Sequence, residues 1–240
     1  MQISGFLKTS LIEWPGKVTS VIFTSGCNFR CPFCHNSDLV LSKKPFLIKE
    51  SEVLTDLEKR KKWTDAVVVT GGEPTLQPDL DLFLQKCKNL GFLTMVHTNG
   101  NRPEIVENLI KQNLVGFWAM DLKGDFENYE KYTGIKIETE NIKKSLKLIA
   151  KNKSEFELRT TIVPGLHDRE NLTKLARQLK KEIENYKLKT VNFRWFLQQF
   201  QPMNCLDKKY LKIIPYSKQD LEKIYQDLQK IIPKTSLRGV

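Results

Sequence analysis

Three cysteines close together in the chain are the residues best suited to carry chemistry. Cys27, Cys31 and Cys34 have the spacing C-x3-C-x2-C and are three of the five cysteines in the sequence. We expect free thiols, because an odd number cannot all pair and a cytoplasmic chain is kept reduced. Thiolates are soft ligands that suit zinc or an iron–sulfur cluster.

The number of ligands bears on the choice between these two metals. A closed structural zinc site takes four protein ligands, and His35 is a candidate for the fourth. It directly follows Cys34, however, and adjacent residues rarely reach one tetrahedral ion without strain. A cubane cluster held by three cysteines leaves one iron open to a small molecule. Cys87 shares the register of a predicted helix core and Cys205 lies in a polar loop, so neither is expected to be a ligand.

A glycine pair forms the second candidate motif. Thr70 is followed by Gly71, Gly72, Glu73 and Pro74, directly after an apolar run. Two glycines let the backbone approach a ligand closely, and a glutamate beside them can accept hydrogen bonds from an ammonium group. The motif is weak alone and becomes strong when it follows the cysteine loop.

Alternating strands and helices must position both motifs. Apolar, β-branched runs predict strands at 18–25, 66–70, 92–97, 115–121, 156–163 and 190–196. Amphipathic periods between and after them predict helices at 50–62, 78–90, 103–112, 140–152, 168–183 and 217–232. Pro78 and Pro103 suit a first helical turn, and Thr139, Asp168 and Ser217 suit caps.

Six strand–helix units in strict alternation predict an α/β fold, a partial (β/α)6 TIM-like barrel with a parallel sheet and helices outside. Six units are fewer than a closed eight-fold barrel needs, and functional loops should lie at the carboxyl ends of the strands. We expect a single domain over 1–240, with an N-terminal extension (1–17), a barrel core (18–202) and a C-terminal loop and helix (203–240). The hydrophobic content of 40% excludes a disordered or fibrous chain.

The chain is basic, with a net charge of +11. Residues 1–120 carry only +2, whereas residues 121–240 carry +9. An acidic partner such as a protein, a nucleic acid or a membrane surface fits this excess, as does a lysine-rich solvated surface.

No run of 18 apolar residues is present and the start of the chain lacks a signal-peptide layout, so we expect no membrane contact and a cytoplasmic location.

The pair of motifs resembles the radical S-adenosylmethionine (SAM) enzymes, and the strand–helix alternation matches that family's partial barrel over nearly the whole chain. The resemblance implies that the three cysteines hold a [4Fe–4S] cluster whose open iron takes the amino and carboxylate groups of SAM. It also implies that Phe33 lies near the adenine. Gly71, Gly72 and Glu73, with Pro74 completing the motif, would hold the methionine ammonium.

A narrower resemblance comes from residues 11–17 and the cysteine loop, which are similar to activating enzymes of glycyl-radical enzymes, above all the activators of anaerobic ribonucleoside-triphosphate reductase. Such an enzyme cleaves SAM reductively, and the resulting 5′-deoxyadenosyl radical abstracts hydrogen from a glycine of its partner. An electron donor such as flavodoxin or ferredoxin is implied. Segments at later strand ends imply SAM contacts by Asn99, Asp121, Lys123 and Arg159.

Two histidines, His35 and His167, are further expected SAM contacts. A third, His97, stands where related activases often have an acidic residue, which puts a monovalent-cation site built on that acid in doubt. An inward-facing Arg159 in an apolar strand also needs a carboxylate partner.

Other readings remain open on the sequence. The same chemistry could serve a pyruvate formate-lyase-type partner, a small molecule as in deazaguanine synthesis, or RNA, which the basic second half allows. A non-enzymatic iron–sulfur or zinc module is the remaining alternative, but the Gly-Gly-Glu-Pro motif would then have no role.

Overall fold

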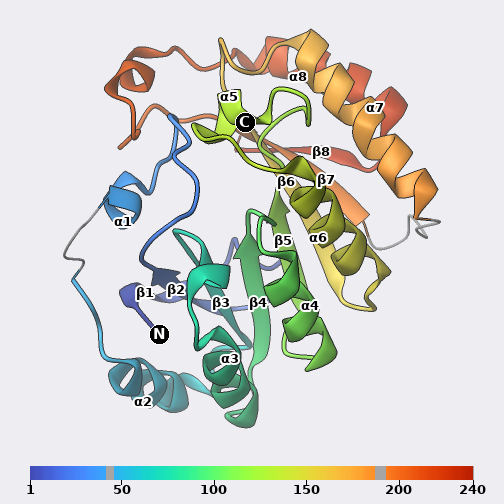
Figure 1. Cartoon of the computed structure of the whole chain (residues 1–240). Coiled ribbons are helices and arrows are strands. Elements are labelled where there is room, and N and C mark those ends of the chain that lie inside the picture. The colour runs from blue at the N-terminus through green and yellow to red at the C-terminus, as the bar shows by residue number, and fades with distance from the viewer. Residues whose placement is uncertain (42–45, 187–192, 240) are drawn as a thin grey trace.

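One eight-stranded sheet in chain order forms the centre of the molecule (Figure 1). The computed structural model describes residues 1–41, 46–186 and 193–239. β1 pairs antiparallel with β2, and every later pair of neighbouring strands is parallel. The strands are β1 (Ile3–Ser10), β2 (Thr19–Thr24), β3 (Ala66–Gly71), β4 (Leu93–Thr98), β5 (Phe117–Asp121), β6 (Glu155–Ile162), β7 (Phe193–Gln199) and β8 (Thr235–Arg238).

Strands β2 to β7 lie where the apolar runs predicted them, which confirms the α/β class and the mostly parallel sheet. The start of the last predicted strand, 190–192, lies outside the described residues. The sequence did not reveal β1 and β8, which come from the segments 1–17 and 203–240. β1 leaves much of its length exposed and β8 has only four residues, so neither carries a long apolar run.

Helices cover the outer face of the curved sheet (Figure 1). Six of them correspond to the predicted ones, and the short helices α1 and α5 were not predicted. The helices are α1 (Ser37–Leu41), α2 (Glu50–Arg60), α3 (Leu80–Asn89), α4 (Pro103–Lys111), α5 (Tyr129–Thr133), α6 (Thr139–Lys151), α7 (Arg169–Asn185) and α8 (Lys218–Ile231), with 3-10 turns η1 (Pro74–Leu76) and η3 (Lys208–Lys212).

The starts of the helices agree with the sequence prediction at three residues and differ from it at two. Pro103 opens α4, Asp168 accepts from the Asn171 backbone at 2.8 Å, and Ser217 caps α8. Thr139 was predicted as a cap but is the first helical residue of α6, where Glu138 holds the cap position without a side-chain bond. Pro78 precedes α3, which begins at Leu80.

The sheet is buried on both faces, as expected for the inner strands of a barrel. Along β3, Val67 and Val69 belong to the core beneath the helices, whereas Ala66 and Val68 belong to a second core inside the curved sheet. Trp14, from the loop after β1, fills that inner core. Trp14 therefore packs against the inner face of the sheet, whereas the cavity lined by the cysteine loop lies at the carboxyl ends of the strands. Among the described residues, no helix is long and apolar enough to cross a bilayer.

Candidate active site

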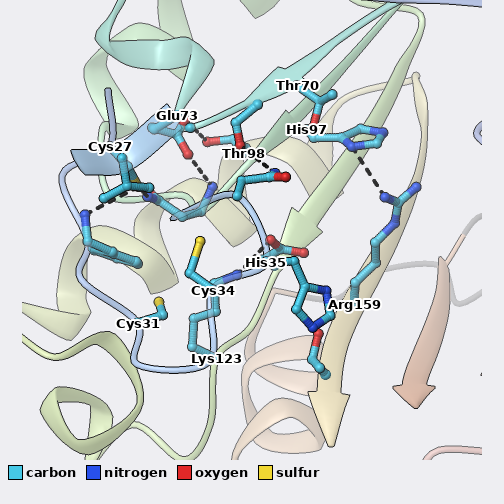
Figure 2. Close-up of a pocket in the computed structure, with 18 of the residues that line it drawn as sticks. Cys27, Cys31, Cys34, His35, Thr70, Glu73, His97, Thr98, Lys123 and Arg159 are labelled. Carbon is cyan, nitrogen blue, oxygen red and sulfur yellow. Dashed lines mark hydrogen bonds and ion pairs between the residues drawn. The ribbon is translucent and has the colours of Figure 1, made fainter. Parts of the chain in front are cut away.

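The carboxyl ends of the strands and the cysteine loop surround a cavity of about 240 Å³. Figure 2 shows the residues around it, with the cysteine side chains beside Lys123 and with His97 and Arg159 farther along the strands. Every site residue that the sequence predicted lines this cavity except His167. They are Cys27, Cys31, Phe33, Cys34, His35, Gly71, Gly72, Glu73, Pro74, Asn99, Asp121, Lys123 and Arg159.

The cysteine loop is held in place by hydrogen bonds to two elements. The Arg30 N–H donates to the Thr133 carbonyl at 2.8 Å, at the end of α5. The Asn36 side-chain amide donates to the Gly71 carbonyl at 3.0 Å, at the end of β3. These contacts hold the loop between α5 and the end of β3.

The Cys31 thiol is buried, and those of Cys27 and Cys34 are partly buried. Burial raises the pKa of Cys27 to about 11 and that of Cys31 to about 12. A coordinated thiol is deprotonated by the positive charge of its metal, so these side chains become thiolates only around a cationic centre. Among the described residues, no three His, Cys, Asp or Glu side chains converge on a single-ion site. Cysteines around a cavity suit a cluster, in which each cysteine binds a different iron.

A partly buried lysine lies beside the cysteine loop (Figure 2). Lys123 Nζ is 2.7 Å from Asp121 Oδ2. Burial opposes the charge, but the Asp121 carboxylate raises the pKa of Lys123 above its usual value. Lys123 is therefore a cation beside the cysteine loop, paired with Asp121.

The glycine pair packs backbone to backbone against the cysteine loop. The Glu73 N–H donates to the Gly26 carbonyl at 2.8 Å, and the Gly72 N–H donates to the Thr24 carbonyl at 2.9 Å. A Cβ at Gly72 would lie 1.9 Å from the Gly26 oxygen, and one at Gly71 would lie 2.4 Å from the Thr24 nitrogen. Only glycine permits this approach, which brings the two motifs together in one cavity.

The Glu73 carboxylate accepts hydrogen bonds from its own loop and from the end of β4. Its carboxylate is 1% exposed and accepts from the Thr75 hydroxyl (2.6 Å), the Thr98 hydroxyl (2.8 Å) and the Asn99 N–H (2.7 Å). These bonds tie the loop after β3 to the end of β4. Asn99 in turn donates to Asn28 Oδ1 at 2.7 Å and so reaches the cysteine loop. Glu73 thus organises the loops of the cavity, with its carboxylate occupied by protein donors.

His97 is partly buried at the end of β4, with its Nδ1 3.3 Å from Arg159 Nη1. Burial, reinforced by the charges of Arg159 and Arg238, holds the pKa of His97 well below its usual range. Because arginine only donates, Nδ1 accepts and the ring proton is on Nε2, which faces Glu13 Oε2 at 3.7 Å. This position therefore carries a neutral ring bonded to an arginine, with no negative charge.

The carboxylate partner expected for Arg159 is Glu157, which forms an ion pair with the Arg159 Nε. Glu157 lies two residues earlier in β6, so the two side chains are on the same face of the strand. That period-two spacing was the one available signal in the sequence. Glu13 and Asn28 were also missed as site residues, because their contacts join segments far apart in the chain.

His167 does not line the cavity, contrary to the expectation of a SAM contact. Its ring is fully buried, with Nδ1 accepting from the Val163 N–H at 3.1 Å and Nε2 2.7 Å from the Lys123 carbonyl. The ring also stacks on Tyr132. Both nitrogens serve the protein itself, so His167 supports the loop that carries Lys123.

The burial of His167 predicts an acid-sensitive fold. Burial lowers its pKa from 6.5 to about 4, so between these values the unfolded chain binds more protons than the folded one. The free energy of unfolding should therefore fall with decreasing pH by about 1.4 kcal/mol per unit from this residue. Urea unfolding of wild type and His167→Gln at pH 7, 6 and 5, at equal iron content, should give a shallower dependence for the variant. Parallel pH profiles would contradict this assignment.

His35 is held between the cavity and the C-terminal segment. Its ring stacks on Phe200 at 5.8 Å between centroids, and its carbonyl accepts from the Asn204 amide at 3.0 Å. Burial lowers the pKa of His35, which favours a neutral ring. In Figure 1 the segment that follows β7 passes beside the cysteine loop and α1.

The two remaining cysteines are both buried. Cys87 is fully buried in α3, which confirms its place in the core. Cys205 is 7% exposed and packs into the core, although its loop is polar in sequence. Its loop is tied to the cysteine loop where the Asp207 N–H donates to the Pro32 carbonyl at 2.9 Å. Neither thiol lines the cavity.

Fold and site together define a partial-barrel protein with room for a metal cluster and a small molecule at the carboxyl ends of its strands. Residues 21–179 match the family model of the radical SAM superfamily. A Methanocaldococcus jannaschii protein named as a glycyl-radical enzyme activating enzyme is 33% identical over 243 residues, covering 99% of this chain and 96% of the relative. A Clostridium pasteurianum pyruvate formate-lyase-activating enzyme is 28% identical over 231 residues, covering 92% and 94%.

This chain belongs to the radical SAM superfamily and, within it, to the glycyl-radical enzyme activating group. Among solved structures, Streptococcus suis SuiB bound to S-adenosylmethionine has a TM-score of 0.69 at 19% identity and supports the fold alone. The match covers 91% of this chain and half the length of SuiB. The protein is thus a radical SAM enzyme whose cofactors are a [4Fe–4S] cluster and SAM.

Proposed function

We propose that this enzyme installs a glycyl radical on a partner enzyme, and that the partner is anaerobic ribonucleoside-triphosphate reductase. The observation that carries the proposal is a single cysteine motif and glycine pair around one cavity, in a chain that matches a glycyl-radical activating enzyme over its whole length. The reductase is favoured over other partners by the resemblance of residues 11–17 and the cysteine loop to its activators. Free thiols suit a reaction in the reducing cytoplasm.

The residues that would hold the cofactors are those of the cavity. Cys27, Cys31 and Cys34 would ligate three irons, and the backbone around Gly71 and Gly72 would hold the methionine end of SAM. When bound, the cluster supplies the electron for reductive cleavage of SAM, and the resulting 5′-deoxyadenosyl radical takes a hydrogen atom from glycine.

The chain's own side chains would bind and orient SAM. Lys123 places a partly buried cation, paired with Asp121, beside the cysteine loop. Asn99 and Arg159 would contact SAM from the ends of β4 and from β6, with Phe33 and His35 alongside the cysteines. Glu73 would hold the loops in register so that these groups face one point.

The uneven charge favours acidic macromolecular partners. Residues 121–240 carry a net charge of +9, and a positive field steers association with anionic surfaces. Both the glycyl-radical enzyme and an electron donor such as flavodoxin or ferredoxin would then dock by their acidic faces.

The test is radical transfer to a candidate partner. Reconstituted enzyme is reduced and incubated with SAM and the reductase, and electron paramagnetic resonance should show a glycyl doublet that is absent without SAM. A second incubation replaces the reductase with pyruvate formate-lyase, the candidate that the Clostridium pasteurianum relative favours. A doublet only with the lyase would reassign the partner. Methionine release without a doublet on either protein would refute glycyl activation.

A further inference from the structure

A buried ion network lies on the inner face of β6, below the cavity. Glu157 and Arg159 face inward from the same strand, with 1% and 8% of their surfaces exposed. Arg159 donates to Glu157 Oε1 through its Nε only. A buried carboxylate is stable only with its charge matched and its lone pairs filled, so the other oxygen of Glu157 needs a donor too.

That donor comes from the last strand of the sheet. Arg238 of β8 donates Nη1 to Glu157 Oε1 and Nη2 to Oε2, each at 2.9 Å, as a two-pronged guanidinium–carboxylate pair. Its guanidinium carbon lies 3.8 Å from the centre of the Phe196 ring, on the intervening strand β7. Arg238 is thus anchored by a stacking contact and occupies both oxygens of Glu157.

Arg159 is left with one guanidinium nitrogen that has no partner among the described residues. Its Nη1 faces His97 at 3.3 Å, while its Nη2 is buried and has no hydrogen-bond partner among the described residues. In a guanidinium, Nε and Nη2 form one fork that would normally take both oxygens of a carboxylate. Arg238 Nη2 is the donor to Glu157 Oε2, and the fork of Arg159 is only half used. Arg159 lines the cavity with an unused donor.

We propose that Arg238 is a positioning residue that keeps Arg159 Nη2 free for SAM by occupying Glu157. Without Arg238, Glu157 Oε2 loses its donor, and Arg159 closes its fork on Glu157 and withdraws Nη2 from the cofactor. The strand β8, far from the cysteine motif in sequence, thereby controls affinity for SAM. The inference rests on the assignment of Arg159 to SAM within the proposed function.

Equilibrium dialysis of SAM against the reconstituted, oxidised enzyme tests this without turnover. Arg238→Gln should raise the Kd of SAM about tenfold, the lower end of the effect of residues that orient a ligand-binding side chain. Arg159→Gln should raise it at least as much. The double variant should match Arg159→Gln alone, because Arg238 acts only through Arg159. Arg238→Lys keeps the charge but not the two-pronged bond, and should raise the Kd less than Arg238→Gln.

The control is Arg194→Gln, which removes an exposed arginine at the position of β7 that is in register with Glu157. It should leave the Kd unchanged at equal iron content. An unchanged Kd in both Arg238 variants would overturn the proposal. It would also be overturned if Arg238→Gln raised the Kd by the same factor in the wild type and in the Arg159→Gln variant. An unchanged Kd in Arg159→Gln would overturn the SAM assignment of Arg159 with it. The absence of a glycyl doublet with the reductase would not change the Kd values expected here, because dialysis measures SAM binding and not radical transfer.

Discussion

Replacing Cys31 with alanine is expected to abolish the cluster and reduce SAM cleavage to background. Cys31 is the most buried of the three loop cysteines, between Cys27 and Cys34 in sequence. A cubane bound by two thiolates has two unligated irons and is lost under reconstitution conditions. Removing one buried thiol should cost the fold only about 1 kcal/mol. The measurements are iron content, visible absorbance and methionine release after anaerobic reduction.

Cys87→Ala is the matched control for this variant. It also deletes a fully buried thiol, but one that lies in the core of α3 and not in the cavity. It should keep full iron content and SAM cleavage while losing a similar amount of stability. If Cys31→Ala retained the iron and the activity of wild type, the cysteine loop would not be the cluster site.

Gly72→Ala should have the second largest effect, because it separates the two motifs. The added Cβ would lie 1.9 Å from the Gly26 oxygen, and that atom is backbone next to Cys27. One loop must move, and forced repacking of this kind costs about 1–3 kcal/mol. Affinity for SAM should therefore fall about 10- to 100-fold, as measured by equilibrium dialysis at equal iron content.

Gly116→Ala provides the comparison for Gly72→Ala. At Gly116 the nearest atom to an added Cβ is Cη2 of Trp14 at 3.4 Å, an ordinary contact. This variant should bind SAM as wild type does. Equal affinities of the Gly72 and Gly116 variants would show that close backbone approach at Gly72 is not needed for binding.

Local patterns were sufficient to predict the inner strands and the main helices. Strands β2 to β7 are apolar because both of their faces are buried, as at Val67 and Val68 of β3, which belong to opposite cores. Burial on two faces leaves a strong signal in a single segment. β1 and β8 lie at the edges of the sheet and are only partly buried, so their pattern is too weak to read. Cys205 shows the same limit, because a polar loop gave no sign that its thiol is buried.

The candidate site contains residues that short motifs predict and residues whose roles depend on contacts with distant segments. The cysteine loop and the glycine pair are contiguous motifs, and the structure brings them together as the sequence predicted. His167 was misassigned because only its partners, the Lys123 carbonyl and the Val163 N–H, show that both ring nitrogens are used within the protein. Glu73 was assigned to a ligand, whereas its bonds to Thr98 and Asn99 depend on β4 lying beside β3.

The sequence by itself determined the chemistry of this protein, because the spacing of three thiols and the position of two glycines after a strand are properties of short segments. Only the tertiary structure decided how the charges are shared. Glu13, His97, Glu157, Arg159 and Arg238 come from four strands or loops, and they meet because the sheet curves and faces them inward. In that interior a carboxylate or guanidinium must be paired, so the side chains of distant segments fix which donor remains free at the cavity.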